Sequence, residues 1–170
     1  IDNKFTRVSY SEAFDILKNS NYNKKKKFEY SIDKWGSDLQ SEHERFLVEK
    51  HFKAPVIIYD YPSKIKAFYM KRDTENDKLA LGVDMIAPEG FGEIVGGGQR
   101  EDDHDTLLSR IKDHKLPIDP FQWYLDLRKY GSVPHSGYGL GIERTVGWIC
   151  GTKHVRETIP YPRTMYRIEP

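Results

Sequence analysis

Apolar residues follow a helical spacing in the first fifty positions of the chain. Ser9 and Glu12 have the spacing of a capping box, and the apolar residues at positions 13, 14, 16 and 17 would share one side of the helix that follows. Ser41 and Glu44 repeat the same spacing, and apolar residues continue from there toward Phe52. The pattern therefore predicts two amphipathic helices before the first apolar strand.

The middle of the chain has the shorter period that is typical of strands. Pro55–Tyr59 is apolar and β-branched, as expected for a buried strand. Lys66–Lys71 alternates between polar and apolar residues, and Leu79–Ile86 does so less cleanly. The polar stretch Asp73–Lys78 between them predicts a hairpin loop. A further strand is expected over Glu93–Gly98, which ends in three glycines.

Helices are predicted again over Asp105–Lys115 and Phe121–Lys129, before a glycine-rich strand at Gly137–Gly141. Several consecutive strands without regular helical crossovers indicate an α+β fold. We expect an antiparallel β-sheet flanked by helices, in a single domain over residues 1–170.

Composition narrows the class of protein. The 27 basic and 26 acidic residues leave a net charge of +1, so no overall field marks a nucleic-acid binder. The four consecutive lysines Lys24–Lys27 are expected in a solvated loop rather than in a nucleic-acid contact. The single cysteine, Cys150, excludes an internal disulfide framework, fits the cytoplasm and is predicted to be a small core residue of a helix. No apolar run approaches the ~20 residues of a membrane helix.

The strand Gly137–Gly141 carries the clearest chemical signal. Its glycines alternate, which leaves one face without side chains and allows a ligand or another backbone to approach closely. Arg144 follows at a predicted junction of strand and helix, where a planar guanidinium could meet phosphate oxygens or stack on a ring. These features indicate half of a nucleotide site.

Longer blocks carry a family resemblance. The segment Arg128–Arg144, which contains Arg-Lys-Tyr-Gly-Ser-Val-Pro-His-Ser-Gly, resembles the third signature motif of class II aminoacyl-tRNA synthetases. The block Asp84–Glu101, with Gly-Glu-Ile-Val-Gly-Gly-Gly-Gln-Arg, and the segment Pro160–Thr164 are similar to the aspartate/asparagine branch. Tyr61–Met70 and Asp38–Glu44 also resemble the asparaginyl members of that branch. The resemblance implies the later half of a class II catalytic core, and we recognise neither motif 1, motif 2 nor an anticodon-binding domain.

The resemblance assigns roles to four charged residues. Asp84 and Glu93 correspond to the acids that hold the Mg²⁺ accompanying ATP, and oxygen ligands suit that ion. Arg100, which by itself could simply pair with Glu101 at the surface, corresponds to the arginine that reads the amino-acid side chain. Arg144 corresponds to the motif-3 arginine that contacts the γ-phosphate and covers the adenine ring.

Further residues are implied around these four. Gly137, Gly139 and Gly141 would line the ATP site together with Glu93 and Arg144. Gly97 and Lys66 would belong to the amino-acid pocket, although the Lys66 ammonium could equally lie in solvent. His135 is expected to position other groups rather than act as a base, because the carboxylate of the amino acid is already ionised.

The implied activity is that of an asparagine–tRNA ligase, with ATP, L-asparagine and tRNA as substrates, Mg²⁺ as cofactor, and a cytoplasmic homodimer without membrane contact as the parent enzyme. Two alternatives remain open. A related asparagine synthetase would activate aspartate and then amidate it, and a non-catalytic module would bind a nucleotide or a partner only. Retention of Asp84, Glu93, Arg100 and Arg144 together argues against the latter.

Overall fold

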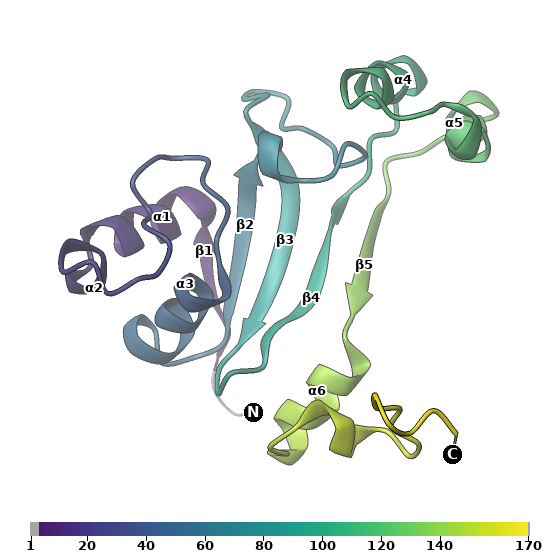
Figure 1. Ribbon diagram of the computed structural model, residues 1–170. Coiled ribbons are helices and arrows are strands. Elements are labelled where there is room, and N and C mark those ends of the chain that lie inside the picture. Colours follow the sequence, from purple (N-terminus) through teal and green to yellow (C-terminus); the bar gives the residue numbers. More distant parts are fainter. Residues whose placement is uncertain (1–3, 170) are drawn as a thin grey trace.

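One five-stranded sheet organises the computed structural model, which describes residues 4–169, and its strand order is β1-β2-β3-β4-β5 (Figure 1). The strands are β1 (Thr6–Ser9), β2 (Val56–Pro62), β3 (Leu79–Ala87), β4 (Gly92–Gln99) and β5 (Ser136–Leu140). The pairs from β2 to β5 are antiparallel, whereas β1 runs parallel to β2. The α+β class is confirmed, but the expectation of a purely antiparallel sheet is wrong at this edge.

The parallel edge has a simple physical basis. A parallel pair needs a crossover connection, and the helices between β1 and β2 supply one. No strand was expected at Thr6–Ser9 because only Val8 of its four residues is buried, so the segment shows no strand pattern of its own.

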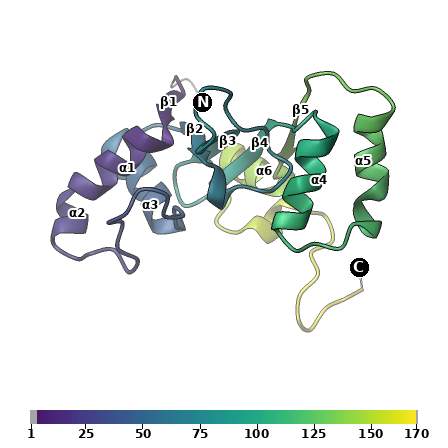
Figure 2. The ribbon, with the colours of Figure 1, turned by 90° about the horizontal axis from the view of Figure 1, so that it is seen from above.

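Helices cover the sheet at the β1–β2 end, as Figures 1 and 2 show. They are α1 (Tyr10–Asn19), α2 (Asn21–Lys24), α3 (Ser41–Arg45) and the π-helix η1 (Phe46–His51). Leu17 of α1, Leu47 of η1 and Ile58 of β2 are fully buried in the main core. Because Ile58 lies opposite Asp84 in the register, Asp84 points to this same face of the sheet, just beyond the helices.

A second, smaller core lies beyond the strand ends at which β4 finishes and β5 begins. It is formed by Leu107, Ile111 and Leu125, which are buried between α4 (His104–Asp113) and α5 (Gln122–Lys129). At the opposite end lie α6 (Ile142–Cys150) and the segment that follows it (Figure 1). Short 3-10 turns complete the chain at Ser63–Ile65, Asp119–Phe121 and Val155–Thr158.

The two predicted capping boxes have different outcomes. At α1 the prediction is confirmed, since Ser9 Oγ accepts from the Glu12 amide at 3.2 Å and Glu12 Oε2 accepts from the Ser9 amide at 2.9 Å. At α3 the cap lies one residue earlier, because the Gln40 amide donates to Nδ1 of the buried His43 at 3.0 Å. Glu44 therefore takes no part in capping.

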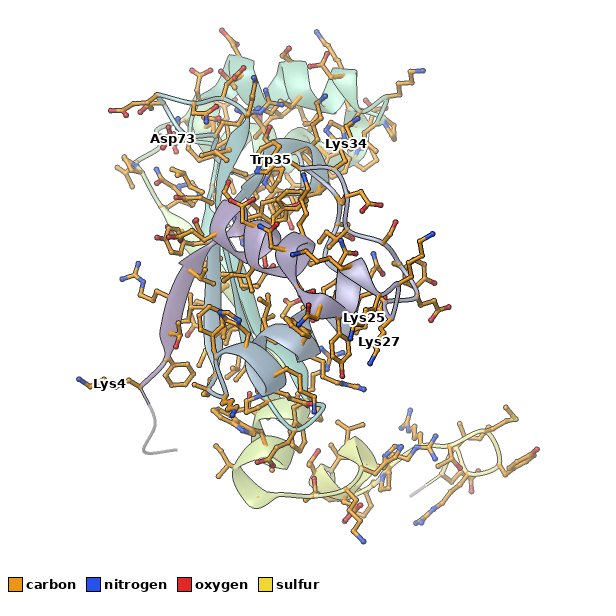
Figure 3. All side chains as sticks on the ribbon, turned by 90° about the vertical axis from the view of Figure 1, so that its left-hand side faces the viewer. Lys4, Lys25, Lys27, Lys34, Trp35 and Asp73 are labelled. Atoms are coloured by element: carbon orange, nitrogen blue, oxygen red, sulfur yellow. The ribbon has the colours of Figure 1, made fainter. Side chains whose placement is uncertain are left out.

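Three further predictions concern Lys66–Lys71, Cys150 and Lys24–Lys27. Lys66–Lys71 is not a regular strand; it makes only an isolated bridge between Met70 and Arg100, because Phe68 and Tyr69 pack against the small core instead. The prediction that Cys150 is a core residue is wrong: it is exposed, because it lies on the solvent side of the last turn of α6. Lys24–Lys27 is exposed as expected, with Lys25 and Lys27 pointing outward in Figure 3, although a short helix begins at Asn21.

Within residues 4–169, every helix is too short or too polar to cross a membrane.

Candidate active site

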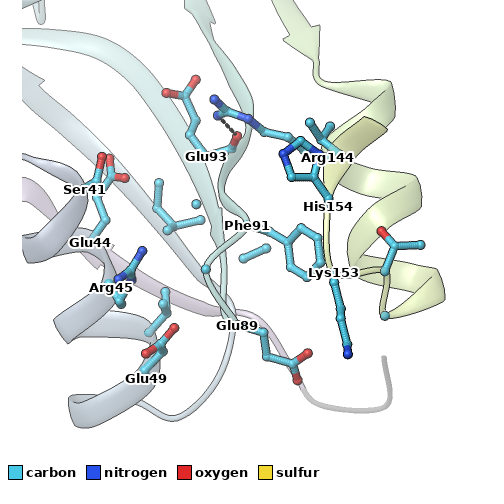
Figure 4. Close-up of a pocket in the computed structure, with 18 of the residues that line it drawn as sticks. Ser41, Glu44, Arg45, Glu49, Glu89, Phe91, Glu93, Arg144, Lys153 and His154 are labelled. Atoms are coloured by element: carbon cyan, nitrogen blue, oxygen red, sulfur yellow. Dashed lines mark hydrogen bonds between the residues drawn. The ribbon is translucent and has the colours of Figure 1, made fainter. Parts of the chain in front are cut away.

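A cavity of about 780 Å³ opens between α3 on one side and α6 with its following loop on the other (Figure 4). The β3–β4 hairpin around Ala87–Glu93 forms the base of this cavity. Charged side chains face it from both walls, and they include Glu44, Arg45, Glu93, Arg144 and Lys153. The cavity is large enough for a nucleotide-sized ligand.

Beside this cavity, one face of β4 and β5 is formed by glycines, and we call this surface the glycine floor. Gly96 lies opposite Gly139, and Gly98 lies opposite Gly137, so these four glycines occupy the same face of β4 and β5. Gly141 continues the row and lies beside Arg144 in a second hollow of about 460 Å³. At Gly139 no side chain lies near the backbone, so a flat ring or sugar could approach it directly, and the ligand expected for this strand stays a prediction.

Gly97 contributes in a different way. Its side of β4 is the opposite face, where a methyl group would lie 2.7 Å from the Gly137 carbonyl oxygen and 2.8 Å from Cβ of Tyr138. The missing side chain allows β5 to pair closely with β4. Gly97 thus contributes to the site by allowing β4 and β5 to pair closely, and it lies on the face of β4 opposite the glycine floor.

Asp84 and Glu93 meet above Gly96. A methyl group on Gly96 would collide with Glu93 Oε1 and would lie 3.4 Å from Asp84 Oδ1. Burial, followed by the charge of Asp84, raises the pKa of Glu93, while Lys66 and Arg144 act in the opposite direction. Two close carboxylates with this mutual repulsion fit a hard cation that keeps water or phosphate oxygens as its other ligands. Among residues 4–169, no third His, Cys, Asp or Glu joins them in metal-binding geometry.

Lys66 is directed at Asp84 and not at solvent. Its Nζ lies 2.5 Å from Asp84 Oδ2 and 3.8 Å from the centre of the Tyr61 ring. The aliphatic part of the side chain passes over Gly82, whose added methyl group would lie 3.6 Å from Lys66 Cε. Burial and the neighbouring Asp84 raise the pKa of Tyr61, so its hydroxyl stays protonated. Lys66 is therefore part of the same charged group as the two acids.

Arg100 lies at the other end of the glycine floor. A methyl group on Gly137 would be 3.0 Å from its Nη2 atom, so the guanidinium covers this glycine. Its Nη1 donates to Met70 Sδ at 3.2 Å and to the Gly98 carbonyl at 3.3 Å. The simple alternative of an ion pair with Glu101 is wrong, because the carboxylate of Glu101 turns away into the protein. No carboxylate of residues 4–169 lies within ion-pair distance of Arg100.

Arg144 reaches back across the sheet from the first turn of α6. Its Nη1 donates to the Glu93 carbonyl at 2.8 Å, the contact drawn in Figure 4. The side chain is exposed, so most of its donors face the cavity. His135 lies farther back, where Nδ1 contacts the Val133 carbonyl at 2.8 Å and Nε2 lies 3.4 Å from the buried Arg128. Its contacts suit the predicted positioning role.

Sequence reasoning missed Glu44 as a cavity residue. Its carboxylate faces the cavity from α3 and is partly buried, without an ion-pair partner among the described residues. The pKa of Glu44 is raised to about 7, mainly by burial and then by the charges of Glu93 and Asp84. A sequence signal for this role existed, because Glu44 belongs to the block Asp38–Glu44 that resembles the family. The helix-capping interpretation assigned Glu44 a structural role instead.

The structure thus brings the predicted charged residues to one face of the sheet. Lys66 and Arg100 lie over Gly82 and Gly137, the two acids lie over Gly96, and Arg144 lies next to Gly141. A row of cations and acids along a bare floor can bind an anionic nucleotide, a cation and a small polar ligand side by side.

Comparisons with known proteins agree with this arrangement. The family described as tRNA synthetases class II (D, K and N) matches residues 1–165. The asparagine–tRNA ligase of Desulforamulus reducens is 55% identical over 166 residues, which cover 98% of this chain and 36% of that protein. The chain therefore spans little more than a third of the length of this curated relative.

Solved structures give the same result. Asparaginyl-tRNA synthetase from Pyrococcus horikoshii complexed with asparaginyl-adenylate aligns with a TM-score of 0.83 at 48% identity, over 98% of this chain and 36% of that one. The Entamoeba histolytica asparaginyl-tRNA synthetase in complex with asparaginyl-adenylate aligns with a TM-score of 0.86 at 37% identity, over 99% of this chain and 37% of that one. The α+β arrangement is that of these catalytic proteins.

Proposed function

Because the chain belongs to the class II tRNA synthetases of the D, K and N group, we propose that it forms the asparagine-activating part of an asparagine–tRNA ligase. The observation that carries the proposal is the gathering of Lys66, Arg100, Arg144 and the two acids along one glycine floor. The substrates would be ATP and L-asparagine, and tRNA would receive the activated amino acid. Residues 1–170 would be the later half of the catalytic domain.

ATP would lie over the strand of Gly137, Gly139 and Gly141, where the backbone of Gly139 is open to the adenine or the ribose, between Arg100 over Gly137 and Arg144 beside Gly141. The exposed donors of Arg144 would bind the γ-phosphate and hold the nucleotide bent. Asp84 and Glu93 would hold Mg²⁺, which when bound supplies positive charge to the phosphate oxygens. The raised pKa of Glu93, caused first by burial and then by the charge of Asp84, supports this role, because a bound cation would offset both the burial of the charge and the repulsion.

Arg100 would bind the side-chain carbonyl of asparagine. Its guanidinium has no acid partner among residues 4–169, and a planar fork fixes one oxygen at a defined angle. Lys66 would stay paired with Asp84 and form the wall of the amino-acid pocket. In the reaction, a carboxylate oxygen of asparagine forms a bond to the α-phosphorus as the bond to pyrophosphate breaks. Arg144 would stabilise the charge that develops on the pyrophosphate.

The second step would transfer the asparaginyl group from the adenylate to a hydroxyl at the 3′ end of tRNA. We propose that the parent enzyme acts as a homodimer in the cytoplasm. Relatives in complex with asparaginyl-adenylate support the choice of asparagine, and the same geometry would serve an enzyme that activates aspartate.

ATP–pyrophosphate exchange tests the proposal. We would replace the corresponding segment of the Desulforamulus reducens relative, which is 55% identical, with this chain, and measure exchange with asparagine, with aspartate and with neither. Exchange that requires asparagine is the expected result. Exchange only with aspartate would transfer the proposal to an asparagine-forming ligase, and no exchange would leave only a binding function. Arg7→Ala is a matched control, because Arg7 lies over Tyr59 on the other face of the sheet.

A further inference from the structure

The guanidinium of Arg100 is held in place by neutral groups only. It lies 5.0 Å from the centre of the Tyr69 ring, and its Nη1 donates to Met70 Sδ at 3.2 Å. These contacts hold one side of the fork and leave the other donors available for a ligand. The position of Arg100 therefore depends on where the segment Tyr69–Lys71 lies.

That segment is not part of the regular sheet. It is tied to the end of β4 by two backbone hydrogen bonds, from the Glu101 amide to the Tyr69 carbonyl at 2.8 Å and from the Lys71 amide to the Gln99 carbonyl at 2.9 Å. These two bonds form the isolated bridge between Met70 and Arg100, and on its other side the segment accepts one bond from β3, from the Leu81 amide to the Lys71 carbonyl at 2.8 Å. A short, irregular attachment of this kind needs further support to hold a guanidinium at a defined angle.

Arg110 of α4 supplies the support. Its Nη1 donates to the Met70 carbonyl at 2.6 Å, and its Nη2 lies 2.8 Å from Glu101 Oε2. One buried guanidinium thus joins the carbonyl of residue 70 to the carboxylate of the residue that follows Arg100. Lys71 completes the group from the other side, with its Nζ 2.8 Å from Glu101 Oε1.

We propose that Arg110 is a positioning residue for Arg100 and thereby sets the selectivity for the asparagine side chain. The proposal rests on the proposed function and concerns a residue that does not touch the substrate. Arg110 and Glu101 are only 8% and 2% exposed, so both charges are desolvated. A buried ion pair adds little net stability compared with apolar residues of similar size. Leu107 and Ile111 on the same helix already provide such apolar packing. The role that remains for the Arg110–Glu101 pair is to fix the position of Met70 relative to Arg100.

The test uses the complete ligase that carries this chain, with Arg110→Met and Arg110→Lys. Arg110→Met loses both contacts, so we expect the KM for asparagine to rise about tenfold and the preference for asparagine over aspartate to fall, while the KM for ATP changes less than twofold. Arg110→Lys can keep one contact, and its KM for asparagine should lie between those of the other two proteins. Arg110→Lys also keeps the test decisive if Arg110→Met does not fold.

Two controls separate positioning from stability. Leu17→Ala in the main core should lower the melting temperature and leave the KM for asparagine unchanged, because Leu17 lies far from Met70 in the other core. Lys112→Met, an exposed position on α4, should change neither quantity. A folded Arg110→Met enzyme with a lower melting temperature but an unaltered KM and preference would overturn the proposal.

A measurement without activity keeps this proposal distinct from the proposed function. In the ¹⁵N NMR spectrum of the 19.9 kDa chain, the Nε signal of Arg100 should move in Arg110→Met and stay in place in Lys112→Met. An unmoved signal would refute the positioning role even in an active ligase. A moved signal in a chain that shows no exchange would retain it and refute only the proposed reaction.

Discussion

Glu44 makes the stability of the chain depend on pH in a way that can be calculated from its surroundings. The carboxylate faces the cavity beside Glu93 and Asp84, and burial, then these two charges, raises the pKa of Glu44 to about 7 from an ordinary value of 4.5. The folded protein therefore binds this proton more tightly than the unfolded chain. The resulting stabilisation is complete below about pH 4.5 and is lost as the pH rises through about 7.

Glu44→Gln replaces the carboxylate with a neutral side chain of the same shape. A pKa difference of about 2.5 corresponds to about 3 kcal/mol at about 1.4 kcal/mol for each factor of ten in proton affinity. At pH 8.5 the variant should therefore be more stable than the original chain by up to about 3 kcal/mol, and at pH 4 the two should be alike.

Urea denaturation of both proteins across pH 4 to 8.5 measures this difference directly. Acids distant from Glu44 titrate equally in both proteins, so they cancel when the free energies of unfolding are subtracted, and the difference reports Glu44 together with its coupling to Glu93 and Asp84. Glu75→Gln, at an exposed position, is the matched control and should show a difference near zero at every pH. A difference for Glu44→Gln that stays constant with pH would refute the reasoning about its burial and its neighbours.

The remaining predictions concern the floor and its arginines. Gly97→Ala should cost about 2 kcal/mol of stability in urea denaturation, because the methyl group meets backbone atoms of Gly137 and Tyr138; an unchanged midpoint would contradict the close pairing of β4 and β5. In the chimera of the Desulforamulus reducens relative that carries this chain, Arg144→Ala should lower pyrophosphate exchange ~10²–10³-fold, and near-normal exchange would exclude Arg144 from phosphate binding. Arg100→Leu should raise the KM for asparagine ~30-fold or more with the KM for ATP unaltered, and equal changes in both constants would contradict side-chain reading.

The sequence predicted the elements whose pattern is local. The capping box at Ser9 and the apolar run of β2 depend on neighbouring residues, and both are found as expected. The alternation at Lys66–Lys71 predicted a strand, and this prediction is wrong because the spacing of apolar residues does not tell which surface they pack on. Phe68 and Tyr69 pack on α4 and α5 and not on a neighbouring strand.

The candidate site shows the same division. Motif spacing placed Asp84 and Glu93 on adjacent strands, and the register brings them together over Gly96. The helix-capping interpretation hid the cavity-facing position of Glu44, which depends on a one-residue shift of the cap that lets His43 take the role expected for Glu44. The pairing of Lys66 with Asp84 likewise requires the tertiary fold.

The bare floor has a thermodynamic consequence for ligand binding. Gly139 has no rotamers to lose when a ligand covers it, so this part of the site adds no side-chain entropy cost to binding. The cost falls on the charged residues around it, and unequally. Arg100 is already half-buried against Tyr69 and Met70, whereas Arg144 is exposed and tied by one hydrogen bond. Under the proposed function, asparagine would therefore meet an ordered arginine, whereas the phosphates of ATP would have to order Arg144 as they bind.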